Sequence, residues 1–248
     1  VGYTGGPLGG AQGGADGVND VFVVKVDATS GELDLEFGDG DGSDNDGIVQ
    51  LNGVNTADAS ANDVSFSSAV DGVGGFYIAG TTYSDLGGNN GGAGDAFVAK
   101  LDTTHGNLDP SFGDGDGSND DGVVQFNTTK VAGTTGEETG DRLIYDGAGN
   151  LFLGGKTQGS LGGAFAGNYD AFVVKLDSTN GSLDAAFGDG DGSNDWQWGG
   201  ELNDDNSPVT WSDSGSPGAQ KSLVDALNDA LAEAETEVDQ YGVEMARL

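Results

Sequence analysis

The chain has 248 residues, and 42 acidic residues against 8 lysines and arginines give it a formal net charge of −34. A surface this acidic repels nucleic acid and anionic lipid, which excludes both as partners. The absence of cysteine excludes disulfides, thiolate catalysis and cysteine-type zinc sites. No apolar run approaches the roughly 18 residues of a membrane span. We therefore expect a protein that works in salt or among bound cations.

The composition favours a folded β protein. The 48 glycines and 4 prolines indicate many turns, but glycine does not recur at every third position, which excludes collagen. Hydrophobic residues make up 35% of the chain and are concentrated in short alternating runs, as in strands. The sequence begins at Val1 without a methionine or a signal segment, so we interpret it as a mature product or an excised fragment.

One block of sequence occurs three times at a constant interval, beginning at Asp20, Asp95 and Asp170. A fixed period of this kind predicts a tandem-repeat architecture. The segments before each block also align, but Leu8 precedes its block by twelve positions, whereas the equivalent leucines of the later copies precede theirs by nine. The first copy is therefore longer by three, and the chain begins inside a repeat.

Each full copy is expected to contain four strands, because period-two runs of β-branched and aromatic residues alternate with Gly- and Asp-rich turns. In the middle copy the expected strands are 122–127, 141–146, 150–157 and 170–177. In the copy before it they are 47–52, 64–71, 75–82 and 95–102. Segments 196–202 and 208–212 would supply the first half of a third unit.

Four short antiparallel strands per repeat are typical of a propeller blade. The runs DGVGGFYIAGTT and DAFVAKLD resemble the bacterial SBBP β-propeller repeat, and GNLDPSFGDGDG beside GVVQFN is similar to the delta-sixty repeat of bacterial surface proteins. The resemblance covers residues 1–200, although these copies are longer, and neither family implies an enzymatic activity. We expect all-β tandem repeats of four-stranded propeller-like blades over 1–212. About three units are too few for an ordinary closed ring, so a fragment, an oligomer or an open array is implied.

Residues 217–248 are predicted to form one C-terminal amphipathic α-helix, because apolar residues recur at steps of three and four. The run SLVDALNDALAEAETEVDQYGVEMARL is similar to the carboxy-terminal core helix of flagellin, with Gly242, Arg247 and Leu248 at matching positions. Met245 and Ala246 replace the Gln-Asn pair usual in that family. The resemblance implies that the β repeats are an exposed insertion on a filament subunit, which self-associates through helix 217–248.

Acidic loops follow the repeated strands and are candidate calcium sites. Oxygen ligands at alternate positions, with glycines between them, suit an ion that takes six to eight oxygens. The candidate ligands are Asp39, Asp41, Ser43, Asp44, Asp46, Asp114, Asp116, Ser118, Asp120, Asp121, Asp189, Asp191, Ser193 and Asp195. The loops lack the closing glutamate of an EF-hand, and the alternative interpretation is a solvated acidic turn in a protein that lives in salt.

The only histidine, His105, aligns with Ser30 and Asn180, each of which precedes a glycine, and it is interpreted as a turn residue. Without a second histidine or a cysteine, a nucleophile–base triad has no support, and we predict that the protein is not an enzyme.

Lys25, Lys100 and Lys175 hold the same position in the three copies. In so acidic a chain this placement predicts a structural ion pair that keeps adjacent units in register. The aspartates two residues after each lysine are the partners considered, since they lie on the same face of a strand.

These features together predict a non-enzymatic structural or adhesive protein of the bacterial cell surface, with calcium-stabilised loops. The alternative is a propeller-type module of a larger secreted protein that binds a glycan or a protein. Trp196, Trp198 and Trp211 could form a sugar platform in that case, although we favour a role as a cap on the last repeat.

Overall fold

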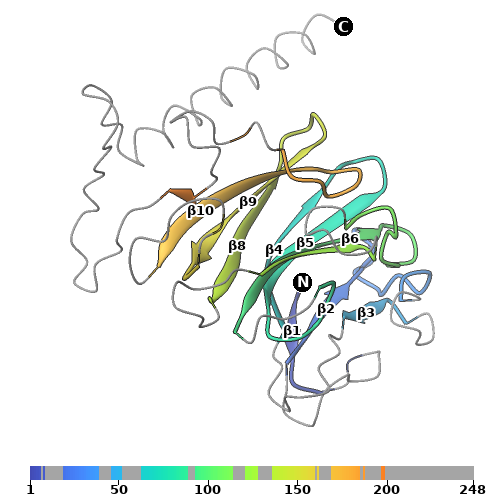
Figure 1. The fold of residues 1–248 in the computed structure, drawn as a ribbon. Helices are drawn as coiled ribbons and strands as arrows, with labels where there is room; N and C mark the ends of the chain where they lie inside the picture. The colour runs from blue at the N-terminus through green and yellow to red at the C-terminus, as the bar shows by residue number, and fades with distance from the viewer. Residues whose placement is uncertain are drawn as a thin grey trace, which may run out of the picture. The chain divides into compact units, whose positions relative to one another are not determined.

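A computed structural model describes the β repeats. The described residues are 1–6, 8, 19–38, 46–51, 63–88, 93–113, 121–127, 136–159, 161, 169–184, 187 and 197–198. In these ranges the chain forms eleven strands and no helix, which confirms the mostly-β prediction (Figure 1). The predicted helix 217–248 and the predicted strand at 208–212 lie outside the described residues.

The strands form three antiparallel sheets, each of which is a simple meander in chain order. Sheet 1 contains β1 (Gly2–Thr4), β2 (Asp20–Val24) and β3 (Ile48–Leu51). Sheet 2 contains β4 (Asp63–Val70), β5 (Gly75–Thr82), β6 (Asp95–Asp102) and β7 (Val123–Phe126). Sheet 3 contains β8 (Glu138–Tyr145), β9 (Asn150–Thr157), β10 (Asp170–Asp177) and β11 (Gln197–Trp198).

The sequence predicts the strands well, but it groups them wrongly into units. It places the strand 122–127 with the strands that follow it, whereas β7 pairs with the preceding β6 as the last strand of sheet 2. β11, predicted to start a new unit, pairs with β10 in the same way. The cause is local: the N–H of Lys100 donates to the carbonyl of Gly122 at 2.9 Å, so the chain returns from the acidic loop directly beside β6.

The sequence period extends to irregular features of the sheets. The register of β4 on β5 shifts between Ser65 and Ser67, and the register of β8 on β9 shifts between Gly140 and Arg142. The two β-bulges therefore occupy equivalent positions in consecutive repeats. A bulge bends a strand and increases its twist, so both sheets are distorted at the same place.

Hydrogen bonds confirm that the first copy is longer than the others. The N–H of Leu8 donates to Oε1 of Gln50 at 3.0 Å, and the N–H of Leu86 donates to Oε1 of Gln125 at 3.1 Å. The two glutamines are separated by one sequence period, but the two leucines are separated by one period and three further positions. The insertion therefore lies between Leu8 and β2.

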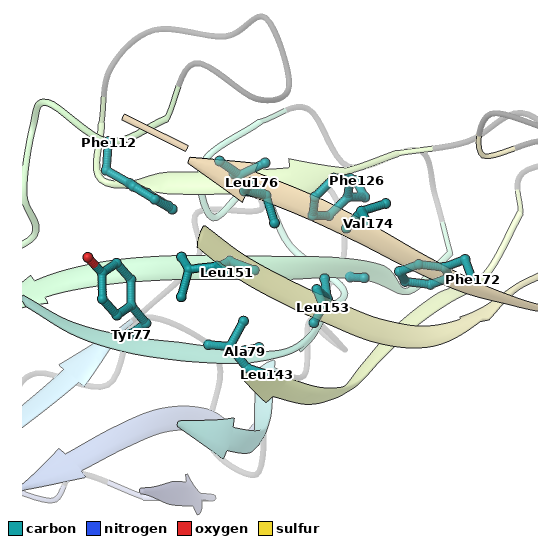
Figure 2. Close-up of a cluster of buried hydrophobic side chains, with 13 residues drawn as sticks. Tyr77, Ala79, Phe112, Phe126, Leu143, Leu151, Leu153, Phe172, Val174 and Leu176 are labelled. Carbon is teal, nitrogen blue, oxygen red and sulfur yellow. The ribbon is translucent and has the colours of Figure 1, made fainter. Parts of the chain in front are cut away.

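Hydrophobic clusters join consecutive sheets. One cluster combines side chains of sheets 1 and 2, and the other combines side chains of sheets 2 and 3. Sheet 2 contributes to both because alternate residues of a strand point to opposite faces: Ile78 and Phe97 face sheet 1, whereas Tyr77 and Val98 face sheet 3. Figure 2 shows the second cluster, in which Phe172 of sheet 3 points into the space between the two sheets. All five side chains are buried.

Candidate functional site

The predicted calcium loops leave and re-enter the sheets through a hydrogen-bonded base. In the first loop the N–H of Gly47 donates to the carbonyl of Phe37 at 2.7 Å, and Asp46 Oδ1 accepts the N–H of Ile48 at 2.9 Å. The second loop makes the same two contacts one sequence period later, at 2.7 and 3.0 Å. The last aspartate of each loop therefore directs one oxygen to the loop base.

The other predicted ligands lie outside the described residues. They are Asp39, Asp41, Ser43, Asp44, Asp114, Asp116, Ser118, Asp120, Asp189, Asp191, Ser193 and Asp195. Within the described part of the chain, no group of three or more His, Cys, Asp or Glu side chains is placed to hold a metal ion. Of the predicted ligands, the structure describes Asp46 and Asp121. Among the described residues, neither belongs to a group of three or more such side chains that could hold a metal ion.

The repeated lysines form ion pairs, but not with the partners considered from the sequence. Each binds the aspartate nine positions later, at 2.7, 2.9 and 2.7 Å, in the pairs Lys25–Asp34, Lys100–Asp109 and Lys175–Asp184. The chain reverses after the repeated strand, and the N–H of each of these aspartates donates to the carbonyl of its lysine. The reversal places the later aspartate opposite the lysine.

The aspartates two residues after the lysines cap the turns instead. Asp102 Oδ1 accepts the N–H of Thr104 at 2.9 Å and the N–H of His105 at 2.7 Å. Burial would raise the pKa of Asp102, but these backbone hydrogen bonds outweigh it and hold that pKa below its usual value. The turn ends at Gly106, whose positive φ of 78° favours glycine. His105 is thus a turn residue, as predicted.

These turns carry the contact between consecutive sheets. The turn of sheet 2 accepts a hydrogen bond from sheet 1, since the N–H of Gly38 donates to the carbonyl of His105 at 2.9 Å. The N–H of Gly113 in sheet 2 donates to the carbonyl of Asn180 in sheet 3 at 3.0 Å. The histidine contributes its main chain to this contact, as does the asparagine that replaces it in the next copy.

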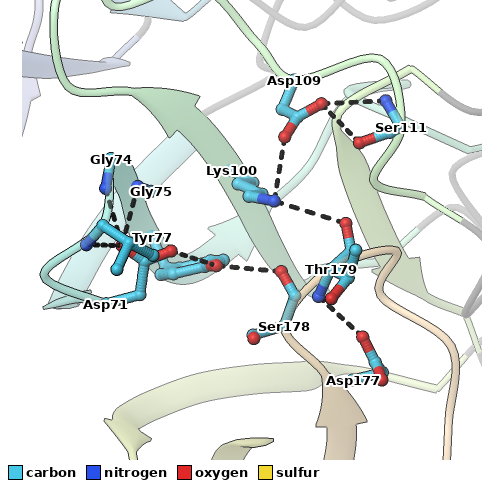
Figure 3. Close-up of polar contacts among 11 residues, drawn as sticks. Asp71, Gly74, Gly75, Tyr77, Lys100, Asp109, Ser111, Asp177, Ser178 and Thr179 are labelled. Carbon is cyan, nitrogen blue, oxygen red and sulfur yellow. Dashed lines mark hydrogen bonds and ion pairs between the residues drawn. The ribbon is translucent and has the colours of Figure 1, made fainter. Parts of the chain in front are cut away.

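Side chains of sheet 2 reach the same turn of sheet 3 (Figure 3). The Tyr77 hydroxyl donates to the carbonyl of Ser178 at 2.9 Å, and Lys100 Nζ donates to the carbonyl of Thr179 at 3.3 Å. The Tyr77 oxygen also lies 3.2 Å from Asp71 Oδ2. Burial, more than any other factor, raises the pKa of Tyr77 well above its ordinary value, so the hydroxyl remains a donor.

Buried acids at the opposite end of the strands were missed by the sequence analysis. Asp20, Asp95 and Asp170, which open the repeated block, are 2%, 1% and 0% exposed. Asp95 Oδ2 accepts a hydrogen bond from the side chain of Gln125 at 2.8 Å, and the first copy has the same pair at 2.7 Å. Gln125 Oε1 also accepts three backbone N–H groups of residues 86–88. The threefold occurrence of this aspartate was a usable signal, since a polar residue repeated at a strand start has a structural cause.

A second missed group joins sheets 2 and 3 at this end. Glu137 accepts hydrogen bonds from the hydroxyls of Tyr83 at 3.4 Å and Tyr169 at 2.8 Å. Lys156 Nζ lies 4.6 Å from the centre of the Tyr169 ring, within the range of a cation–π contact. Burial and then the charge of Glu137 raise the pKa of Tyr83. Nothing in the repeat pattern marks these residues, because Glu137 has no acidic equivalent at position 62.

No protein-family model and no curated protein matches the chain. Among the residues that the structure describes, there is no helix of the length and apolar character required to cross a membrane.

Proposed function

We propose that the chain is a non-enzymatic structural or adhesive protein of the bacterial cell surface. The observation that carries the proposal is that the repeated polar residues make structural contacts. Lys100, the Asp102 turn and Asn180 all contribute to contacts within a repeat or between consecutive sheets. The repeat is therefore a building unit that extends a stack.

The sheets support a finer proposal, that each repeat is a propeller-type blade. Sheets 2 and 3 each have four antiparallel strands in meander order, and the two hydrophobic clusters lie on opposite faces of sheet 2. Small four-stranded sheets that pack face to face are the architecture of a propeller. The resemblance of residues 1–200 to bacterial propeller and surface-protein repeats agrees with this proposal.

Calcium in the acidic loops completes the proposal. A net charge of −34 on 248 residues creates strong self-repulsion. In the sequence, a run of acidic residues fills each of the first two loops, between the residues of its hydrogen-bonded base, and a divalent cation bound there would offset their repulsion. In this proposal the segment 217–248 attaches the repeats to a filament of flagellin-like subunits.

Immunogold electron microscopy of intact cells tests the proposed location and assembly. An antibody against the β repeats is applied to intact and to permeabilised cells that produce the protein. Gold particles on intact cells, arranged along filaments, would support the proposal. Labelling that requires permeabilisation would contradict it.

The second candidate, a binding module for glycans or proteins, is favoured by the Tyr83–Glu137–Tyr169 group. Tyr83 remains 37% exposed although it contacts Glu137, and exposed aromatic rings suit sugar recognition. A glycan array distinguishes the candidates when the wild-type chain is compared with a variant in which the exposed Tyr83 is replaced by alanine. Binding that is lost in the variant would favour the module.

A further inference from the structure

The two interfaces between sheets are built from equivalent residues. At each interface the earlier sheet presents one face, here called face A, and the later sheet presents its opposite face, here called face B. Face A contributes Val21, Val23, Phe37, Val49 and Leu51 in sheet 1, and Ala96, Val98, Phe112, Val124 and Phe126 in sheet 2. Face B contributes Ile78, Phe97, Ala99 and Leu101 in sheet 2, and Leu153, Phe172, Val174 and Leu176 in sheet 3. On each face, every residue of the later sheet lies one sequence period after its counterpart in the earlier sheet.

Face B of sheet 1 is apolar, and no described sheet packs on it. Phe22, Val24 and Val26 are the equivalents of residues that are fully buried in sheet 2. Val26 is 53% exposed, whereas its equivalent Leu101 is 0% exposed. Nearby, Leu33 is 44% exposed. Face B of sheet 1 therefore has the apolar composition of an interface. Face B of sheets 2 and 3 is covered by the preceding sheet, whereas no described sheet covers face B of sheet 1.

Face A of sheet 3 is the other half of the same interface. Phe152, Ala171, Val173 and Phe187 align with four fully buried residues of sheet 2, yet Ala171 is exposed and the other three are half-buried. The ring centres of Phe152 and Phe187 are 5.6 Å apart, close to the 6.0 Å between the equivalent rings of sheet 2. The aromatic pair that receives the next sheet is therefore already assembled in sheet 3.

The turn that would enter this receiving surface is also formed in sheet 1. A Cβ added to Gly106 would lie 2.5 Å from Val49 Cγ2, and one added to Gly181 would lie 2.7 Å from Val124 Cγ2, because each turn packs against the preceding sheet. A Cβ added to Gly31, the equivalent glycine of sheet 1, would have nothing within 4 Å. All three glycines have nearly the same φ, from 74° to 78°. The turn of sheet 1 thus has the right shape, and none of the described sheets packs against it.

We propose that face B of sheet 1 docks on face A of sheet 3 in a second copy of this chain, head to tail. The contact continues an interface that the molecule already makes twice, with the turn at Gly31 entering beside Phe187 of the neighbouring copy. Two copies joined through both pairs of faces contribute six sheets, within the four to eight of propellers. This association is separate from the proposed attachment through 217–248 and does not require the cell-surface role.

The test is the mass of the 248-residue chain in solution, measured by light scattering after gel filtration. The concentration should be about 0.1 mM, in about 0.5 M NaCl, where the Debye length is only a few Å and repulsion between the acidic copies is screened. We expect twice the mass of the chain for the wild type and the mass of a single chain for Val26→Asp and for Val173→Asp. Val73→Asp is the matched control, because Val73 is 89% exposed in a turn of sheet 2, both faces of which are covered.

Mixing the two variants provides a second readout. Val26→Asp keeps a functional face A and Val173→Asp keeps a functional face B, so an equimolar mixture should regain the doubled mass that neither variant shows alone. Circular dichroism confirms that each variant is folded, and Val26→Ser replaces the aspartate variant if it is not. A single-chain mass for the wild type would overturn the proposal. A doubled mass that persists in both folded variants would overturn it too, and would assign the association to another part of the chain.

Discussion

Lys100 and Lys25 make the same ion pair in surroundings that differ in burial. The Lys100 side chain is 12% exposed and reaches the turn of sheet 3, whereas the Lys25 side chain is 37% exposed. Exposed ion pairs contribute little to stability, but the loss of one partner of a buried pair leaves a charge without compensation. The position in the stack should therefore determine the energetic role of each lysine.

We expect Lys100→Met to lower the free energy of unfolding by about 1–3 kcal/mol and Lys25→Met by less than about 1 kcal/mol. Urea denaturation monitored by circular dichroism measures both. Equal losses in the two variants would show that Lys100 does not stabilise the contact between sheets 2 and 3.

Asp71 links a turn to the Tyr77 hydroxyl and should make stability depend on pH. Burial would raise its pKa, but hydrogen bonds from Val73, Gly75, Tyr77 and Gly74 outweigh burial and hold the pKa below 3.8. A lowered pKa in the folded state means that the stabilisation is complete above 3.8 and is lost as the pH falls through the folded value.

Asp71→Asn should therefore cost about 1–2 kcal/mol at pH 7, and the cost should be smaller at a pH below 3.8, where the carboxylate begins to be protonated. Denaturation of both proteins at the two pH values gives the difference directly. A cost that stays constant with pH would mean that the charge of Asp71 is not what stabilises the turn.

The turns are the elements that join one sheet to the next, and three equivalent glycines allow a matched test. Alanine at a φ near 78° is strained by about 1 kcal/mol at Gly31 and Gly106 alike. At Gly106 the added methyl group also collides with Val49 and Phe37, and overpacking of this kind costs a further amount of about 1–3 kcal/mol.

Gly106→Ala should thus destabilise the chain by about 1–3 kcal/mol more than Gly31→Ala, measured at concentrations low enough to keep the chain monomeric. If the two substitutions have the same effect, the turn of sheet 2 does not pack against sheet 1 as described.

The elements themselves were predictable from the sequence, but their pairing was not. Alternation of apolar residues predicted the bounds of β5, β6, β9 and β10 to the residue. It could not assign β7 to sheet 2, because periodicity identifies a strand without identifying its neighbour, and the neighbour was determined by the closed base of the acidic loop. In the same way, the repeat identified the lysines as structural, but only the chain reversal revealed Asp109 as a partner.

The buried acids show another limit of the sequence at the level of elements. Asp95 begins a strand, where a solvated turn residue would be the ordinary interpretation. Its burial depends on Gln125, which is 30 positions away and arrives through β7. A contact between side chains on different strands depends on the pairing, so it could not be predicted before the pairing was known.

At the scale of the whole molecule, two opposing terms determine stability. The apolar clusters on both faces of sheet 2 favour the stack, whereas a net charge of −34 opposes any compact state. In the sequence, the acidic residues of the first two loops lie between the residues that form the hydrogen-bonded bases, Phe37–Gly47 and Phe112–Gly122. Cations that bind in the loops would reduce the repulsion between these acidic residues, close in sequence to the hydrogen bonds that close each loop. Calcium binding is therefore the central element of the proposed structural role.

Differential scanning calorimetry of the intact chain with calcium, with magnesium and with a chelator, at matched ionic strength, tests this claim most directly. We predict a single cooperative transition in which calcium raises the midpoint by more than about 5 °C over the chelator, while magnesium has a much smaller effect because it demands a more rigid octahedral site. Superimposable transitions in calcium and in chelator would contradict the account, because the acidic loops would then be only solvated turns.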